Sequence, residues 1–194
     1  MIQSKEDYKY YIKKDKMANS EGGRKKAILD FFAGNSVHKF LKILRKAEYY
    51  TNVQTPFSRY LQYIYKIRLY VISKKLGYTI PCNTCGAGLS LPHYGPIIIN
   101  GSARIGENCR IHTCVNIGAS GGGMNAPKIG DNVYIGPSAV IFGDISIANN
   151  VTIGANATVN KSCEEENVAL AGTPAKIVKR DKQNWWKSNN LDLY

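Results

Sequence analysis

Residues 129–159 read IGDNVYIGPSAVIFGDISIANNVTIGANATV, and a branched aliphatic residue stands at every sixth position of this stretch. The same spacing extends back to Ile99, with one interruption inside the glycine-rich run 118–127. The members are Ile99, Ile105, Ile111, Ile117, Ile129, Ile135, Ile141, Ile147, Ile153 and Val159. Helices repeat their apolar face about every 3.6 residues and strands every two, so a period of six indicates short strands joined by turns and stacked in columns.

A second column and a glycine position accompany the aliphatic column. Four residues after each aliphatic comes a small or slender side chain, from Ala103 to Cys163. Directly after the aliphatic residue, glycine recurs, at Gly106, Gly118, Gly130, Gly136 and Gly154. Because glycine tolerates the positive φ of a tight corner, we expect these glycines at the corners. The pattern predicts a prism-shaped β-solenoid, since an ordinary sandwich would place its turns about 8–12 residues apart.

Four stretches within residues 86–180 carry a family resemblance. They are GLSLPHYG at 88–95, VNIG at 115–118 with its loop, APKIGDNVYIG at 126–136 and AGTPAKIV at 171–178. With them the chain resembles the hexapeptide-repeat acyltransferases. Within that superfamily it is most similar to serine acetyltransferases and to O-acetyltransferases of surface-polysaccharide clusters. The resemblance implies an α+β fold, in which a small N-terminal helical domain precedes a left-handed parallel β-helix of triangular cross-section.

The chain of 194 residues has a formal net charge of +12, and this charge is distributed unevenly over three parts. Residues 1–80 hold 17 basic and 6 acidic residues, whereas residues 81–172 hold 4 and 6. We therefore expect a basic helical head at 1–80, the β-helix at 81–172 with an extruded loop at 118–128, and a basic tail at 173–194. Such a head can lie close to an anionic membrane, whereas no nucleic-acid motif accompanies the charge.

Helical spacing of apolar residues in the head predicts helices at 27–32, 37–49 and 57–75, and Gly77 is expected to end the last one. His38 is expected to be structural. No run of about 18 apolar residues and no secretory leader is found. With five cysteines, these features favour the cytoplasm. The lone pair Cys82 and Cys85 lacks the further ligands that a zinc site needs.

Transfer of an acetyl group from acetyl-CoA needs a base for the acceptor hydroxyl, donors for the thioester oxyanion and a groove for the pantetheine arm. The resemblance assigns the base to His93, which lies 12 residues before Ile105, as the catalytic histidine of serine acetyltransferases does. A histidine side chain suits proton transfer near neutral pH. Candidate acceptor-binding or auxiliary residues are His112, Tyr94, Asn116 and Asn125.

The resemblance also predicts a binding groove for acetyl-CoA, as a co-substrate, and no metal. The loop that begins at Gly118 resembles the lid over the coenzyme, and the turn at 172–175 resembles the one that borders its groove. Pro137 has no N–H to donate, which moves its contact to Ser138. The expected coenzyme-binding positions are Gly118, Ala119, Pro137, Ser138, Ala155, Thr173, Pro174, Lys176, Lys179 and Arg180.

Four positions depart from the serine acetyltransferase pattern. The second active-site histidine of that family falls on Ala126, its carboxylate-binding arginine on Asn125, and its two aspartates on Pro92 and Tyr78. A zwitterionic amino acid needs charged partners, whereas a neutral sugar hydroxyl does not. The sequence therefore favours an acetyl-CoA-dependent O-acetyltransferase that acts on a sugar of a surface polysaccharide or its precursor, with L-serine as the alternative acceptor.

Two other classes of protein stay open. A γ-type carbonic anhydrase binds zinc through three histidines, and this chain has only His38, His93 and His112, the first of them in the head. A non-catalytic trimeric scaffold is the other class. In the acyltransferase family the cleft lies between adjacent subunits, so the resemblance implies a homotrimer and leaves a hexamer open.

Overall fold

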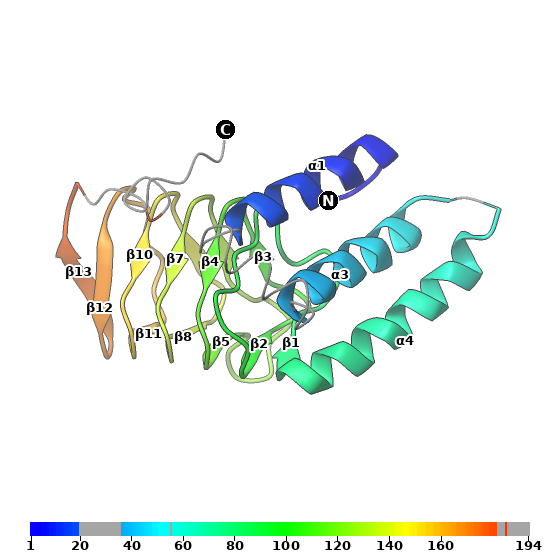
Figure 1. Ribbon diagram of the computed structural model, residues 1–194. Coiled ribbons are helices and arrows are strands. Elements are labelled where there is room, and N and C mark those ends of the chain that lie inside the picture. The colour runs from blue at the N-terminus through cyan, green and yellow to red at the C-terminus, as the bar shows by residue number, and fades with distance from the viewer. Residues whose placement is uncertain (20–35, 55, 182–184, 186–194) are drawn as a thin grey trace.

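The computed structural model describes residues 1–19, 36–54, 56–181 and 185. Within these residues, three helices gather at one end of the molecule and a stack of short strands extends away from them (Figure 1). The helices are α1 (Lys5–Ala18), α3 (Ser36–Asn52) and α4 (Ser58–Leu76). The strands are β1 (Tyr78–Thr79), β2 (Ile97–Ile99), β3 (Arg104–Ile105), β4 (Arg110–Ile111), β5 (Val115–Gly118), β6 (Lys128–Ile129), β7 (Tyr134–Ile135), β8 (Val140–Phe142), β9 (Ser146–Ile147), β10 (Thr152–Ile153), β11 (Thr158–Val159), β12 (Ala169–Gly172) and β13 (Ala175–Lys179).

The strands form three sheets, one on each face of a left-handed triangular β-helix. Their orders are β1-β2-β5-β8-β11, β3-β6-β9 and β13-β12-β10-β7-β4, so each of the three middle coils contributes one strand to each face. The first and last coils reach the β3-β6-β9 face through the isolated bridges Cys85–Ile105 and Ile147–Cys163. Pairing is parallel, apart from the closing β12–β13 hairpin. Lys128 pairs with Ser146, 18 residues further on, whereas Arg104 pairs with Lys128 across a step of 24 that includes the loop after β5. The predicted fold class is confirmed.

Both predicted columns of apolar residues lie inside the prism. The ten aliphatics from Ile99 to Val159 are at most 5% exposed, and the smaller side chains from Ala103 to Cys163 are at most 8% exposed. In a stacked solenoid each coil repeats the environment of the coil below, so one residue type suits every level of a column. These columns form most of one continuous core that also includes Phe40 and Leu44 of α3.

The prediction that the recurring glycines occupy left-handed corners is wrong. Positive φ angles occur three residues after the aliphatics instead, at Asn108, Cys114, Asn132, Ser138, Asn150 and Asn156. Asparagine is among the few residues that adopt this conformation readily. Its side chains also hydrogen-bond along the stack, from Asn108 Nδ2 to Asn132 Oδ1 at 3.2 Å and from Asn132 Nδ2 to Asn150 Oδ1 at 3.1 Å.

At Gly106, Gly130 and Gly136 the absence of a side chain instead allows close approach between coils. A Cβ atom on Gly106 would lie 2.7 Å from the carbonyl carbon of Gly130. A Cβ atom on Gly136 would lie 2.7 Å from the backbone nitrogen of Ala155. Any side chain at either position would collide with main chain, which has little freedom to move in a packed stack.

The head is helical, as predicted. The expected helices at 37–49 and 57–75 correspond to α3 and α4, whereas the one expected at 27–32 lies outside the described residues. Gly77 ends α4 in the left-handed conformation, with φ of 78°. Helix α1 was not predicted as a separate element, although Ser4 accepts a hydrogen bond from the N–H of Asp7 as an N-cap does. None of the described helices is both long enough and apolar enough to cross a bilayer.

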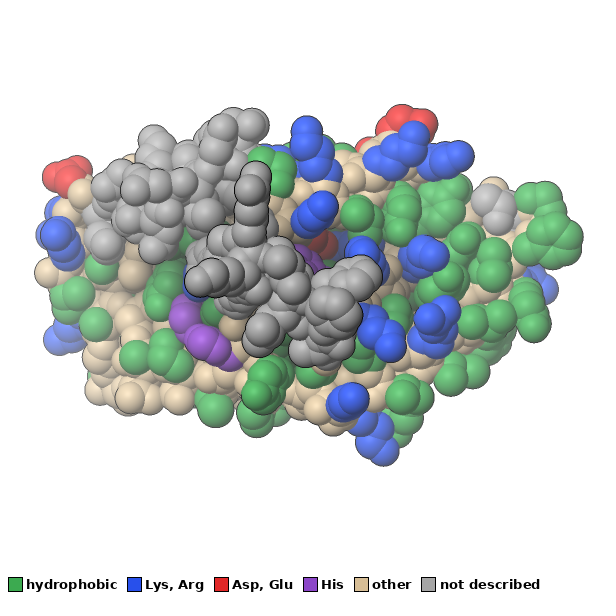
Figure 2. Space-filling view, viewed as in Figure 1, with side chains coloured by type: hydrophobic (Ala, Val, Ile, Leu, Met, Phe, Trp, Pro, Cys, Tyr) green, Lys and Arg blue, Asp and Glu red, His purple; other side chains and the backbone are tan. Residues whose placement is uncertain are grey.

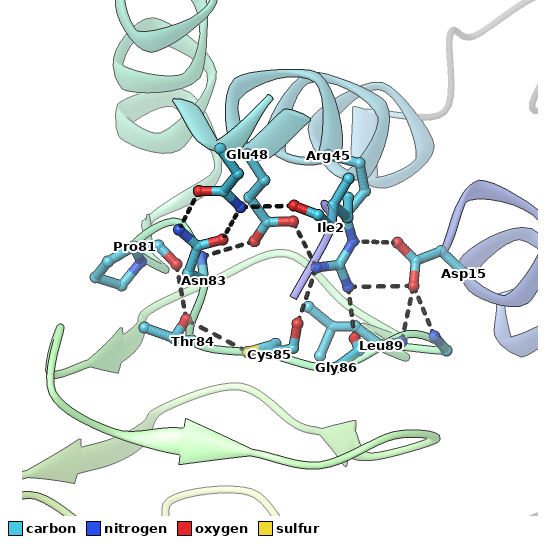
Figure 3. Close-up of polar contacts among 12 residues, drawn as sticks. Ile2, Asp15, Arg45, Glu48, Pro81, Asn83, Thr84, Cys85, Gly86 and Leu89 are labelled. Carbon is cyan, nitrogen blue, oxygen red and sulfur yellow. Dashed lines mark hydrogen bonds and ion pairs between the residues drawn. The ribbon is translucent and has the colours of Figure 1, made fainter. Parts of the chain in front are cut away.

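A buried ionic cluster joins the head to the first coil of the β-helix (Figure 3). Arg45 of α3 is fully buried, and its guanidinium contacts Asp15 of α1 at 2.8 Å and Glu48 at 3.0 Å. The same guanidinium donates to the carbonyl oxygens of Cys85 at 2.9 Å and Gly86 at 2.6 Å. One arginine thus connects both helices with the backbone of the first coil.

Asp15 extends this connection toward the end of the first coil. Its Oδ1 atom accepts hydrogen bonds from the backbone N–H groups of Gly88 at 2.8 Å and Leu89 at 3.0 Å. These residues lie a few positions before His93 on the same coil. The position of the helices therefore determines where that part of the first coil lies.

The C-terminal stretch returns to the β-helix. Strand β13, which lies in the part predicted as a basic tail, pairs antiparallel with β12. Further along, Trp185 is buried against Ala18 of α1, and its Nε1 donates to the carbonyl oxygen of Asn108 at 2.8 Å. The guanidinium carbon of Arg110 lies 5.3 Å from the Trp185 ring centroid.

Candidate active site

One edge of the prism gathers most of the predicted site residues. The edge consists of the turns that follow β4, β7, β10 and β12, and hydrogen bonds connect these turns from coil to coil. Ser138 N donates to Thr113 O at 3.0 Å, and Asn156 N donates to Pro137 O at 3.0 Å. Thr173 Oγ1 then donates to Asn156 O at 3.3 Å. Residues from four successive coils are thus aligned parallel to the prism axis.

His93 lies at the beginning of this edge. Ser90 forms a parallel bridge with Arg110, so the turn that contains His93 precedes the turn after β4 by one coil. The His93 side chain is exposed. Its backbone carbonyl accepts a hydrogen bond of 2.6 Å from the hydroxyl of Tyr78. Burial raises the pKa of Tyr78 well above its usual value, so this hydroxyl keeps its proton over the whole physiological range.

His112 of the next coil lies beside His93. The two ring centroids are 5.9 Å apart, and the ring centroid of Tyr134 lies 5.0 Å from that of His112. His112 is half-buried, and its Nε2 atom is shielded from solvent. The predicted base and the predicted auxiliary histidine are therefore neighbours, although they are 19 positions apart in the sequence.

Pro137, Ser138, Ala155, Thr173 and Pro174 lie along the same edge and are exposed. They follow the two histidines toward the far end of the prism. The edge therefore carries exposed residues on successive coils beyond an exposed imidazole. The N–H of Ser138, an expected contact to the coenzyme, already donates to Thr113 O.

Gly118 and Ala119 lie on the neighbouring edge, where β5 ends and the loop begins. The carbonyl oxygen of Gly118 accepts a hydrogen bond of 3.1 Å from the N–H of Gly143. Inside the loop, Gly121 and Gly122 have positive φ angles of 58° and 74°, which favour glycine. Within one chain, this part of the predicted coenzyme site is thus separate from the edge that carries His93.

The remaining predicted residues occupy varied positions. Asn125 is exposed, and its amide donates to Asp144 Oδ2 at 2.8 Å. The methyl group of Ala126 is buried in the core. Tyr94 is 76% exposed, and Asn116 is exposed on β5.

The predicted phosphate-binding cations lie at the far end of the prism from His93. Lys176 and Lys179 are exposed on β13. Arg180 pairs with Glu165 at 2.7 Å, and both side chains are largely exposed.

The cysteines that were weighed as metal ligands are poorly suited to that role. Burial raises the pKa of Cys82 to about 11 and that of Cys85 to about 12, so both thiols keep their protons near neutral pH. The thiolate is the form that binds metals and attacks disulfides. In the part of the chain that the structure describes, no group of three histidine, cysteine or acidic side chains is placed to hold a metal ion.

Comparisons with known proteins agree with this architecture. Residues 126–161 match the family model described as bacterial transferase hexapeptide (six repeats). The serine acetyltransferase of Staphylococcus xylosus is 32% identical over 144 residues, which are 68% of this chain and 66% of the relative. The chain belongs to the hexapeptide-repeat acyltransferase superfamily.

Solved structures give the same result for this hexapeptide-repeat protein. The serine acetyltransferase of Neisseria gonorrhoeae is 28% identical, with a TM-score of 0.71 over 98% of this chain and 72% of that chain. The soybean serine acetyltransferase apoenzyme has a TM-score of 0.73 over 89% of this chain and 69% of that chain, and its 23% identity supports the fold alone. The chain spans 66% of the Staphylococcus xylosus relative and 46% of the Staphylococcus aureus strain Mu50 one.

Two residues beside the histidines were not singled out as site candidates from the sequence. Tyr78 was noted only as the position where the family has an aspartate, and the structure directs its hydroxyl to the backbone of His93 rather than to the imidazole. Tyr134 lies within the matching stretch 126–136, but only the stacking of β4 on β7 brings it to His112. The sequence signal that could have placed Tyr134 here is its distance of 24 residues from Arg110, with which it pairs in the parallel register.

Proposed function

We propose that this protein is an acetyl-CoA-dependent O-acetyltransferase in which His93 is the general base. The observation that carries the proposal is the exposed imidazole of His93 at the start of the edge formed by the turns after β4, β7, β10 and β12. The hexapeptide-repeat relatives named serine acetyltransferases support the same reaction type.

In the proposed reaction, a ring nitrogen of His93 accepts the proton of the acceptor hydroxyl. The hydroxyl oxygen forms a bond to the thioester carbonyl carbon, and the resulting oxyanion is stabilised by backbone N–H groups. When the tetrahedral intermediate collapses, the carbon–sulfur bond breaks and the CoA sulfur leaves with the proton from His93. The products are the acetyl ester and CoA, and the imidazole returns to its starting state.

The coenzyme is proposed to lie along the edge from His93 to Thr173, with its nucleotide end near Lys176 and Lys179. Stacked strands are about 4.8 Å apart, so the four steps between the two turns span roughly 19 Å. Because Gly118 and Ala119 lie on the neighbouring edge, one chain does not bring the loop over His93. A homotrimer, in which the loop of one subunit faces the His93 edge of the next, would complete the site.

For the acceptor, the comparisons favour L-serine, because the similar proteins are named serine acetyltransferases and the polysaccharide acceptor has no support among them. One structural observation keeps a neutral hydroxyl acceptor as the second candidate. At positions where the family has an arginine and a histidine, this chain has the amide of Asn125, which is bonded to Asp144, and the buried methyl group of Ala126. The cytoplasm remains the proposed compartment.

The test is release of free CoA from acetyl-CoA, followed with a thiol reagent, with L-serine and a panel of neutral sugars as separate acceptors. His93→Ala should lower the rate by about 10²–10⁴-fold, the usual contribution of a general base. His38→Ala, a histidine of α3 in the head, is the matched control and should retain activity. An unchanged rate in His93→Ala contradicts the assigned base, and turnover on serine alone excludes the sugar acceptor.

A further inference from the structure

Helix α4 carries a second apolar face that points away from the rest of the molecule. Its buried side, with Leu69, Ile72 and Leu76, packs into the core. On the opposite side, five large side chains are 62–69% exposed, namely Tyr60, Tyr63, Ile67, Tyr70 and Val71. Their spacing of three, four, three and one residues places them on one face of a helix. We call these five residues the outer face of α4.

Basic residues border this outer face and acidic ones are absent from α4, whose sequence is SRYLQYIYKIRLYVISKKL. At about 100° per residue, Arg59 and Lys66 fall on one flank of the outer face and Arg68 and Lys75 on the other, with Lys74 near its C-terminal end. The helix thus has five basic residues and no acidic one.

Two of these basic side chains lie beside tyrosine rings of α4, one on the outer face and one beside Tyr65, which is half-buried. Lys74 Nζ lies 5.1 Å from the ring centroid of Tyr70, and the guanidinium carbon of Arg68 lies 5.4 Å from that of Tyr65. Figure 2 shows hydrophobic and basic side chains intermingled over the helical end of the molecule. Long basic side chains that cover apolar surface and keep their charge in water are typical of helices at a membrane interface.

Charge decides which occupant fits the outer face of α4. Copies of this face that met one another, across a two-fold axis or around the three-fold axis of a trimer, would bring like-charged clusters of five cations together, which is unfavourable. An anionic bilayer supplies the opposite charge over the whole length of the face, and tyrosine rings are favoured at the level of lipid headgroups. From Tyr60 to Val71 the face is about 17 Å long, at roughly 1.5 Å per residue.

We propose that the outer face of α4 binds the surface of an anionic membrane, with the helix lying in the plane of the headgroups. The tyrosines, Ile67 and Val71 enter the interface, and the flanking lysines and arginines contact lipid phosphates. Each cation close to an anionic bilayer strengthens binding roughly fivefold. This inference does not depend on the proposed acetyl transfer, since it rests on α4 alone.

The test is co-sedimentation of the intact protein with vesicles of phosphatidylcholine alone or with about 30% phosphatidylglycerol added, at low salt and again near 0.5 M salt. The protein should bind the anionic vesicles at low salt and dissociate at high salt. Lys66→Gln with Lys74→Gln should weaken binding about 25-fold. Tyr63→Gln with Ile67→Gln should weaken it by at least tenfold, since it removes much of the apolar area.

The matched control is Lys9→Gln with Lys13→Gln, which removes two exposed charges from α1 of the same head. It should weaken binding by less than about threefold, because charges away from the contact are screened within a Debye length. Circular dichroism and thermal unfolding establish that all variants fold. The proposal is overturned if the wild type ignores anionic vesicles, or if the α1 pair matters as much as the α4 pair. It is also overturned if light scattering shows that the α4 substitutions dissociate an oligomer while vesicle binding is unchanged.

Discussion

Replacing Arg45 by methionine should destabilise the folded protein by about 3–5 kcal/mol, the usual cost of removing one partner from a buried ion pair. Arg45 is fully buried, with Asp15 at 2.8 Å and Glu48 at 3.0 Å, and both carboxylates are 2% exposed. Without the guanidinium, two negative charges stay buried near each other and the carbonyls of Cys85 and Gly86 lose their donors. A loss of this size is a large part of the roughly 5–15 kcal/mol that stabilises a typical domain.

The measurement is urea unfolding followed by far-ultraviolet circular dichroism, at one fixed protein concentration because association adds to stability. Adding Asp15→Asn and Glu48→Gln to Arg45→Met should recover at least half of the loss, because neutral amides remove the uncompensated charge and still accept hydrogen bonds. Lys42→Met, an exposed residue of the same helix, is the control and should change stability by less than about 0.5 kcal/mol. A loss below about 1 kcal/mol in Arg45→Met, or no recovery in the triple variant, would refute the reasoning.

Four further outcomes are expected in other parts of the molecule. Gly136→Ala should lower the thermal midpoint by several degrees, from about 1–3 kcal/mol of overpacking against the next coil, whereas Gly101→Ala, with open space around it, should not. In native protein the exposed Cys114 should react with iodoacetamide while Cys85, whose pKa burial raises to about 12, should not. The Cys85 thiol loses its proton at lower pH in the unfolded chain than in the folded one. The free energy of unfolding should therefore fall as pH rises from about 9 toward 12, and a flat profile would contradict this prediction. Tyr78→Phe should cost about 0.5–1.5 kcal/mol of stability and lower kcat, as it removes the hydrogen bond to the neighbouring histidine carbonyl.

The β-helix could be predicted from the sequence because its contacts repeat. Each position packs on the same position of the next coil, and the three faces of a coil are similar, so the packing requirement recurs every six residues from Ile99 to Val159. The corner assignment failed for a related reason. Glycine recurs at 106 and 136 because the backbone of the next coil is close, whereas the left-handed residues are Asn108 and Ser138. Composition alone does not separate these two uses of small residues.

The candidate site was predictable only in part. His93 and His112 were identified as candidates from the motif and from their phase in the repeat, and the structure places their rings together. The Asp15–Arg45 contact has no comparable signal, since it joins two helices 30 residues apart and neither residue repeats. Such isolated long-range contacts leave no periodic trace, so they become visible only in three dimensions.

The loop between β5 and β6 does not disturb the pairing of the strands around it. The strands on either side of it pair in parallel with two residues each, although the step from Arg104 to Lys128 is six residues longer than the step from Lys128 to Ser146. Its length is therefore uncoupled from the pitch of the scaffold. A β-helix built this way can carry a loop of different length and chemistry at this point without rebuilding the body that supports it.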